Sequence, residues 1–248
     1  MGIFDKLREI KENRYKKRLE KCRRTVKNPK AVKDDRMAAL SFLADLDDME
    51  ASVPVLLLRF DYSLENGIID TREKELAMEG VVRWEEKARA LVTEHLKQTT
   101  RIAWPIKILN KIASPEDVAA SLIEALNFDV ASFDQAAIDK NYDILCYLRD
   151  FKIEEVCERL SVFLHDSDER VRFACAETLI EQGDDSVSAK LEPFLVDESS
   201  ENRRIRKVVL DAFVRRGWKI ADPSRFQHEL VAEGVFFNKK SQTLTQRA

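Results

Sequence analysis

Apolar residues recur at the spacing of one helix face in two stretches of the chain that lie 34 residues apart. In each stretch they stand at i, i+3, i+4, i+7 and i+8, which places the side chains on one side of an α-helix. The first set is Val171, Ala174, Cys175, Thr178 and Leu179, and the second is Ile205, Val208, Val209, Ala212 and Phe213. A glycine follows each stretch, at Gly183 and Gly217. A fixed period built from helical segments predicts a helical repeat architecture.

The same unit recurs near the start of the chain. A shift of 136 residues, four periods of 34, aligns Arg172 with Arg36 and Leu179 with Leu43 across residues 30–61. Residues 135–166 match at a shift of 31. The pattern therefore predicts an all-α fold with about five to six helix pairs over residues 29–235. An arginine that recurs with the period, as Arg36, Arg172 and Arg206 do, is expected to belong to the scaffold.

Two local signals mark helix starts between these copies. Ser114-Pro115-Glu116-Asp117 combines a capping serine, a first-turn proline and two acidic residues, which the amino end of a helix favours. Asp70 and Glu73 have the spacing of a capping box, in which the first side chain caps the helix and the second reaches back to it. We therefore expect one helix to start near residue 115 and another near residue 71.

The chain begins with a basic segment and ends with a polar one. Residues 1–28 are expected to form one helix with two short apolar stripes, Ile3, Leu7 and Ile10, then Tyr15, Leu19, Cys22 and Val26. This helix either caps the first repeat or lies on an anionic membrane surface. The candidate membrane or partner docking residues are Lys16, Lys17, Arg18, Arg23 and Arg24. Residues 236–248 are predicted to be a polar, frayed tail.

The charge is distributed unevenly along the chain. Charged residues make up 35% of the sequence, against about 25% in an average globular domain. Residues 1–33 contain thirteen Lys and Arg and four Asp and Glu, a net charge of +9, whereas the remainder has a net charge of −12. An acidic body repels phosphate, which makes nucleic acid an unlikely partner of residues 34–248.

No motif for catalysis or for metal and cofactor binding is present in the sequence. The three histidines are far apart, and no HExxH, GxGxxG, P-loop or GxSxG pattern occurs, so we expect a non-enzymatic protein without a cofactor or a metal. The four cysteines form no CxxC pair, which favours reduced thiols and a cytoplasmic location. There is no apolar run of about 18 residues that would span a membrane.

Two charged groups are candidates for binding a partner. The basic group is Arg203, Arg204, Lys207, Arg215, Arg216 and Lys219, which we expect to meet an anionic partner. The acidic group is Glu154, Glu155 and Glu158, on a predicted second helix. Either group is equally consistent with a solvated helix face.

The segment from Leu164 to Val187 resembles the HEAT-repeat family. The resemblance consists of Asp166 and Asp168, Val171-Arg172, and Leu179 before a Gly-Asp turn. It implies a right-handed superhelix of helix pairs whose second helices line a concave surface, and a role as a scaffold or adaptor that binds a protein partner. Some alkylpurine DNA glycosylases and bilin lyases also contain such repeats. Nucleic-acid binding or DNA repair, chromophore handling, and a peripheral membrane adaptor docked through residues 1–28 therefore stay open as alternatives.

Overall fold

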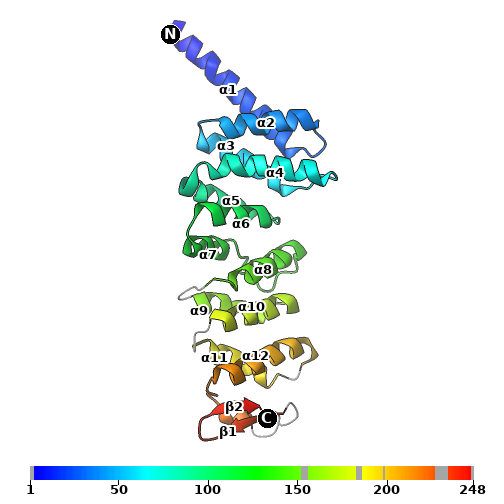
Figure 1. Ribbon diagram of the computed structural model, residues 1–248, viewed down its shortest axis with the longest axis vertical. Helices are drawn as coiled ribbons and strands as arrows, with labels where there is room; N and C mark the ends of the chain where they lie inside the picture. Colours follow the sequence, from blue (N-terminus) through cyan, green and yellow to red (C-terminus); the bar gives the residue numbers. More distant parts are fainter. Residues whose placement is uncertain (1–2, 152–155, 183–185, 198, 227–233, 247–248) are drawn as a thin grey trace. The chain divides into compact units, whose positions relative to one another are not determined.

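The computed structural model describes residues 3–151, 156–182, 186–197, 199–226 and 234–246, and it is mostly helical (Figure 1). Helices account for 74% of the structure, with little strand, which confirms the all-α class. The chain divides into two compact units, residues 1–125 and 126–248, which are described separately below.

The first unit is a series of antiparallel helices with short connections. Its elements are α1 (Ile3–Lys27), α2 (Lys33–Asp45), α3 (Met49–Leu57), η1 (Leu58–Asp61), α4 (Gly67–Val82), η2 (Glu85–Ala88), α5 (Arg89–Gln98), α6 (Ala103–Ile112) and α7 (Pro115–Glu124). Helices α2, α4 and α6 are consecutive first helices of pairs, with α3, α5 and α7 as their second helices. Each first helix packs against the next, α2 on α4 and α4 on α6.

The second unit continues the alternation and ends in a hairpin. Its elements are α8 (Gln135–Leu148), α9 (Val156–Leu160), η3 (Ser161–His165), α10 (Glu169–Gln182), α11 (Ser186–Leu191), η4 (Glu192–Leu195), η5 (Ser200–Asn202), α12 (Arg203–Arg216), η6 (Pro223–Phe226), β1 (Val235–Asn238) and β2 (Thr243–Gln246). Here α8, α10 and α12 are the first helices, and α10 packs against both of the others.

The period of the sequence is the interval between first helices. In the first unit these helices begin at Lys33, Gly67 and Ala103, intervals of 34 and 36 residues. In the second unit they begin at Gln135, Glu169 and Arg203, two intervals of 34. The interval from Ala103 to Gln135 is 32 residues. The described chain therefore contains five helix pairs and a sixth first helix.

A glycine allows a close approach of helix α4 to its neighbours in the first unit. A Cβ added to Gly80 on α4 would lie 2.8 Å from the Cβ of Ala44 and 2.9 Å from Cδ1 of Leu56. Gly80 is therefore the residue that lets α4 rest directly on α2 and α3. The surrounding side chains of Leu40, Leu56 and Val81 are fully buried.

The carboxyl half of α1 is packed on the body of the first unit. Tyr15 donates a hydrogen bond of 2.7 Å to the carboxylate of Asp48, and the Arg18 guanidinium lies 3.5 Å from the centre of the Phe42 ring. The side chain of Val26 is completely buried. These contacts come from the second predicted stripe and its neighbours, so this half of the helix caps the first pair.

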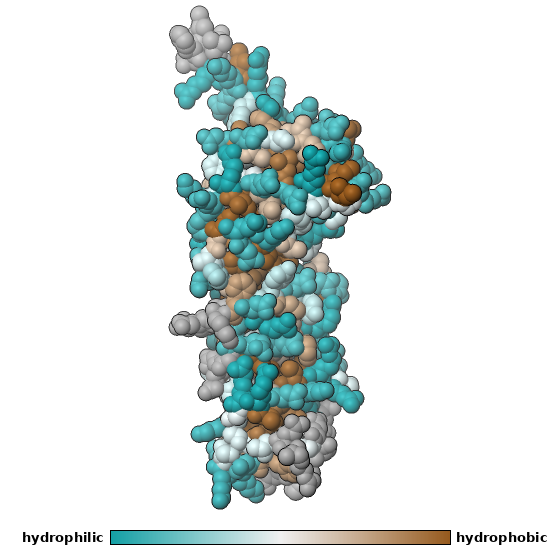
Figure 2. All heavy atoms as spheres, viewed as in Figure 1, coloured by the Kyte–Doolittle hydropathy of each residue, from teal (hydrophilic) through white to brown (hydrophobic). Residues whose placement is uncertain are grey.

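The amino half of α1 extends beyond α2 and α3 in Figure 1. Residues 8–14 are all exposed, and Ile10 of the first predicted stripe is 48% exposed. Figure 2 shows mostly hydrophilic residues on the described part of this helix. The capping interpretation thus holds for residues 15–27 and does not extend to residues 8–14.

The predicted polar tail is a hairpin over its described part. Strands β1 and β2 pair antiparallel, with Val235 opposite Gln246 and Asn238 opposite Thr243. Leu244 is buried, and β2 packs against α12. The described residues of the predicted tail are therefore paired rather than frayed, because Val235 on β1 and Leu244, which stands between Thr243 and Thr245 on β2, bury one face of the hairpin.

Candidate functional site

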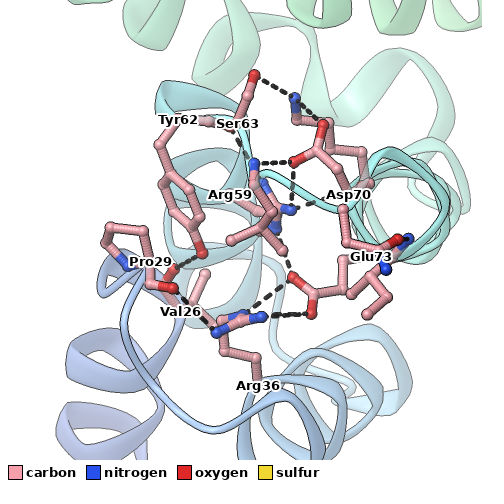
Figure 3. A network of polar contacts seen from close by, with 12 residues as sticks. Val26, Pro29, Arg36, Arg59, Tyr62, Ser63, Asp70 and Glu73 are labelled. Carbon is pink, nitrogen blue, oxygen red and sulfur yellow. Dashed lines mark hydrogen bonds and ion pairs between the residues drawn. The ribbon is translucent and has the colours of Figure 1, made fainter.

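A network of buried charges joins the first two helix pairs of the first unit (Figure 3). Glu73 on α4 has no exposed surface. Its carboxylate accepts hydrogen bonds of 3.0–3.2 Å from Nε and Nη2 of Arg36 on α2 and one of 2.8 Å from Nε of Arg59 on η1. Arg59 is also fully buried, and Arg36 is only 4% exposed. One carboxylate therefore neutralises cations from two other elements.

Asp70 extends this network towards the surface. Its carboxylate accepts hydrogen bonds of 2.7 Å from Nη2 of Arg59 and from Nζ of Lys74, and one of 2.9 Å from the backbone N–H of Leu64. Burial alone would raise the pKa of Asp70, but the hydrogen bonds from Lys74, Arg59 and Leu64 outweigh it and lower the pKa. Asp70 is therefore ionised in the folded protein at neutral pH.

The expected capping box at Asp70 and Glu73 is wrong. Helix α4 begins four residues earlier than predicted, at Gly67, and the side chain of its cap residue Asn66 accepts a hydrogen bond from the N–H of Ile69. The start predicted at Pro115 is confirmed, with Ser114 accepting from the N–H of Asp117. Asp70 and Glu73 lie inside α4 and face Arg59, 11 and 14 residues away in sequence.

The recurring arginine performs the same task in both units. Arg36, Arg172 and Arg206 are each the fourth residue of a first helix. Arg36 donates to backbone carbonyls five and seven residues upstream, Arg172 to carbonyls five and six residues upstream, and Arg206 to the carbonyl of Leu195. Each arginine thus holds the segment that precedes its helix through hydrogen bonds, which confirms that these arginines have a structural role within the repeat.

Asp70 is the fourth residue of α4, the position that carries arginine in α2, α10 and α12. At this position the arginines donate hydrogen bonds to backbone carbonyls. Asp70 carries the opposite charge and accepts a hydrogen bond from a backbone N–H, that of Leu64. Arg59 supplies the cation that this position lacks. We conclude that the network maintains the fold rather than binding a ligand.

Replacing Asp70 by Asn is expected to lower the free energy of unfolding at pH 7 by about 1–2 kcal/mol. Because the folded pKa of Asp70 is depressed, its contribution is present above the unfolded pKa of about 3.9 and is lost as the pH falls through the folded pKa. Urea denaturation between pH 7 and pH 3 measures this. The difference in the free energy of unfolding between wild type and variant should become smaller below about pH 4. A difference that stays constant with pH would refute the role of ionised Asp70.

An open groove of about 680 Å³ lies in the second unit, between η3 and the α11–η4 segment. Val162, Ala189 and Pro193 give it an exposed apolar rim. Charged and titratable side chains complete the lining, and they are His165, Asp166, Arg172, Lys190, Asp197 and Glu201. Arg172 is held in the wall by its loop carbonyls and by a 3.0 Å hydrogen bond to Asn202. The wall of the groove that contains Arg172 is therefore fixed by hydrogen bonds within the protein.

The carboxylates of the groove differ in their environment. Burial raises the pKa of Asp166. The pKa of Asp197 is lowered, because hydrogen bonds from Asn202 and Ser199 outweigh the effect of its burial. Together with Arg172 and Lys190, these carboxylates give the groove charged groups of both signs.

The predicted basic group does not form one patch. All six residues are exposed, but they are spread along the chain: Arg203, Arg204 and Lys207 lie near the start of α12, Arg215 and Arg216 lie at its end about 18 Å away at 1.5 Å per residue, and Lys219 follows the helix. Arg204 lies 3.8 Å from Glu169 and Arg215 lies 3.5 Å from Glu181, both on α10. Surface pairs of this kind contribute little to stability, so these residues are still open to solvent at the two ends of the helix.

Of the predicted acidic group, only Glu158 is described. It lies 2.5 Å from Lys190, whose side chain lines the groove. Glu154 and Glu155 lie outside the described residues. Sequence reasoning missed the groove because it combines apolar and charged residues from separate elements, none of which forms a local motif.

The predicted docking residues on α1 point in several directions. Lys16 pairs with Glu12 at 2.7 Å, and Arg18 covers the Phe42 ring. Lys17, Arg23 and Arg24 are exposed. Only some of these cations are therefore available on the side of α1 that faces away from the body.

The structure brings few reactive groups together. Cys22, Cys157 and Cys175 are buried and Cys146 is half-buried, and all four are thiols outside disulfides. Within the described ranges, no group of three or more His, Cys, Asp and Glu side chains is placed to hold a metal ion. No described helix is both long and apolar enough to cross a bilayer.

Comparison with known proteins gave no relative: no family model, no curated protein and no solved structure matches the chain.

Proposed function

We propose that the protein is a non-enzymatic scaffold, a HEAT-like right-handed superhelix of helix pairs that binds a protein partner. The groove beside Val162 is the observation that supports this function best. Five helix pairs and a sixth first helix at near-constant intervals support the repeat architecture, because each repeat buries one face on its neighbours and leaves the other exposed.

The composition of the groove suits a protein segment. It is open rather than enclosed, with an apolar rim and charged groups of both signs around it. Protein interfaces combine apolar and polar contacts over an open surface, whereas small-molecule sites are concave and mostly apolar. Val162, 41% exposed, would be an apolar contact, and Glu201, whose side chain is 80% exposed, would pair with a cation of the partner.

Site-specific photo-crosslinking in cells tests this function. A photoreactive amino acid in place of Val162 should crosslink one predominant protein, identified by mass spectrometry. Tyr147 on α8 is the matched control, because it is 40% exposed in the same unit and does not line the groove. With the purified partner, Val162→Glu should weaken binding at least about 10-fold, the effect of burying one unpaired charge.

Two results would contradict the proposal. The first is the same set of crosslinked proteins from positions 147 and 162, which would indicate collisions without a specific site. The second is unchanged affinity of the Val162→Glu variant for the crosslinked protein.

A further inference from the structure

A stripe of exposed residues runs along α1. Its members follow the spacing i, i+4, i+7, i+11 and i+14, and they are Ile10, Arg14, Lys17, Lys21 and Arg24. At 3.6 residues per turn they fall within an arc of about 80° and extend over about 21 Å. All five are exposed. We call this set the basic stripe of α1.

The basic stripe lies on the side of α1 that is turned away from the body. The packed residues Tyr15, Leu19, Cys22 and Val26 occupy a different arc, centred about 150° from the stripe. The described acidic residues of α1 (Glu9, Glu12 and Glu20) fall outside the stripe. The helix therefore sorts its charges, with an acid-free line of four cations facing solvent.

The amino half of α1 also lacks the support that helices of this length need. Residues 8–14 are exposed on all sides, so they lack the tertiary packing that supplies most of the stability of helices in proteins. A surface that contacts the basic stripe would supply this support. Ile10, at the end of the stripe, would add apolar contact.

We propose that the basic stripe of α1 docks the protein on an anionic phospholipid surface. A straight row of cations on the side opposite the body fits a plane, because the packed helices of the first unit then stand on the far side of α1 and do not obstruct contact. Lys and Arg near an anionic leaflet each strengthen binding substantially, and an apolar residue among them is typical of helices that lie at the interface. This inference does not rest on the scaffold function.

Vesicle co-sedimentation of the full-length chain tests the lipid surface. Vesicles of phosphatidylcholine with about one third phosphatidylglycerol should bind at least about 100-fold more tightly than pure phosphatidylcholine, since several cations act together. Binding should weaken in 0.5 M NaCl, because salt screens the charges. Equal binding to both vesicle types would overturn the proposal.

Two matched triple variants test the stripe itself. Lys17→Gln, Lys21→Gln and Arg24→Gln remove three stripe cations, whereas Arg8→Gln, Lys11→Gln and Arg23→Gln remove three from other sides of the helix. All six residues are exposed, so circular dichroism should show equal folding. The stripe variant should lose about 100-fold in binding to the anionic vesicles, and the control should lose at least tenfold less. Equal losses would overturn the oriented contact.

A duplex DNA of 20 base pairs at the same salt concentration separates lipid from other polyanions. We expect weaker binding to DNA than to the anionic vesicles. DNA binding that depends on the stripe, without vesicle binding, would overturn the lipid assignment.

Discussion

Replacing Glu73 by Gln is expected to lower the free energy of unfolding by about 3–5 kcal/mol. Glu73 is the carboxylate that faces both Arg36 and Arg59. Without its charge, two buried guanidinium groups lose their shared partner, and uncompensated charge in the interior is costly. The amide nitrogen of Gln would also point a donor at groups that can only donate.

Urea denaturation followed by circular dichroism and by tryptophan fluorescence measures this loss. Trp84 and Trp104 report on the first unit and Trp218 on the second, so the change should appear in the fluorescence of the first unit. Glu75→Gln is the control, because Glu75 is exposed on the same helix, and its effect should stay within about 0.5 kcal/mol. If Glu73→Gln lowered the free energy of unfolding by less than about 1 kcal/mol, the charge of Glu73 would not be needed to compensate the two buried arginines.

Replacing Gly80 by Val should destabilise the first unit by about 3 kcal/mol. The added Cβ would lie 2.8–2.9 Å from the Cβ and Cα of Ala44, closer than atoms pack without overlap. The neighbour includes backbone, which cannot swing aside. Helix propensity favours any ordinary residue over glycine by up to about 1 kcal/mol, so the steric term must exceed that gain.

Gly67 provides the opposite case on the same helix. A Cβ added there meets nothing within 4 Å, and Gly67→Ala should stabilise the protein by about 0.4–1 kcal/mol because it restricts the unfolded chain. Thermal unfolding compares both variants with wild type. A Gly80→Val protein as stable as wild type would mean that α4 can move away from α2 without loss.

The repeat could be predicted from the sequence because its features are periodic. Arg36 and Arg172 stand 136 residues apart, and each donates to carbonyls upstream of its helix. A residue with a local partner leaves a local pattern, which recurs whenever the unit recurs. The intervals between first helices follow the same period, so the period of the sequence predicts the helix pairs.

The buried network was not predictable in this way. Glu73 and Arg36 are 37 residues apart, and their contact depends on how α2 packs against α4. The capping-box spacing of Asp70 and Glu73 suggested a local role, but tertiary pairing with Arg59 prevailed. The groove beside Val162 was missed for the same reason, since its lining comes from five separate elements. A long-range contact that occurs only once produces no repeated pattern in the sequence.

Each unit has an element that covers an apolar face of its helices, α1 in the first unit and β2 in the second. In the first unit, α1 covers the outer side of the first helix pair with Cys22 and Val26. In the second unit, β2 lies against α12, and Trp218 and Leu244 are buried there. A bare terminal repeat would offer another copy the apolar face that successive repeats bury, and chains would then polymerise end to end. Within the described residues, α1 covers this face of the first helix pair and β2 covers this face of α12, so neither of these two covered faces is open to a second copy.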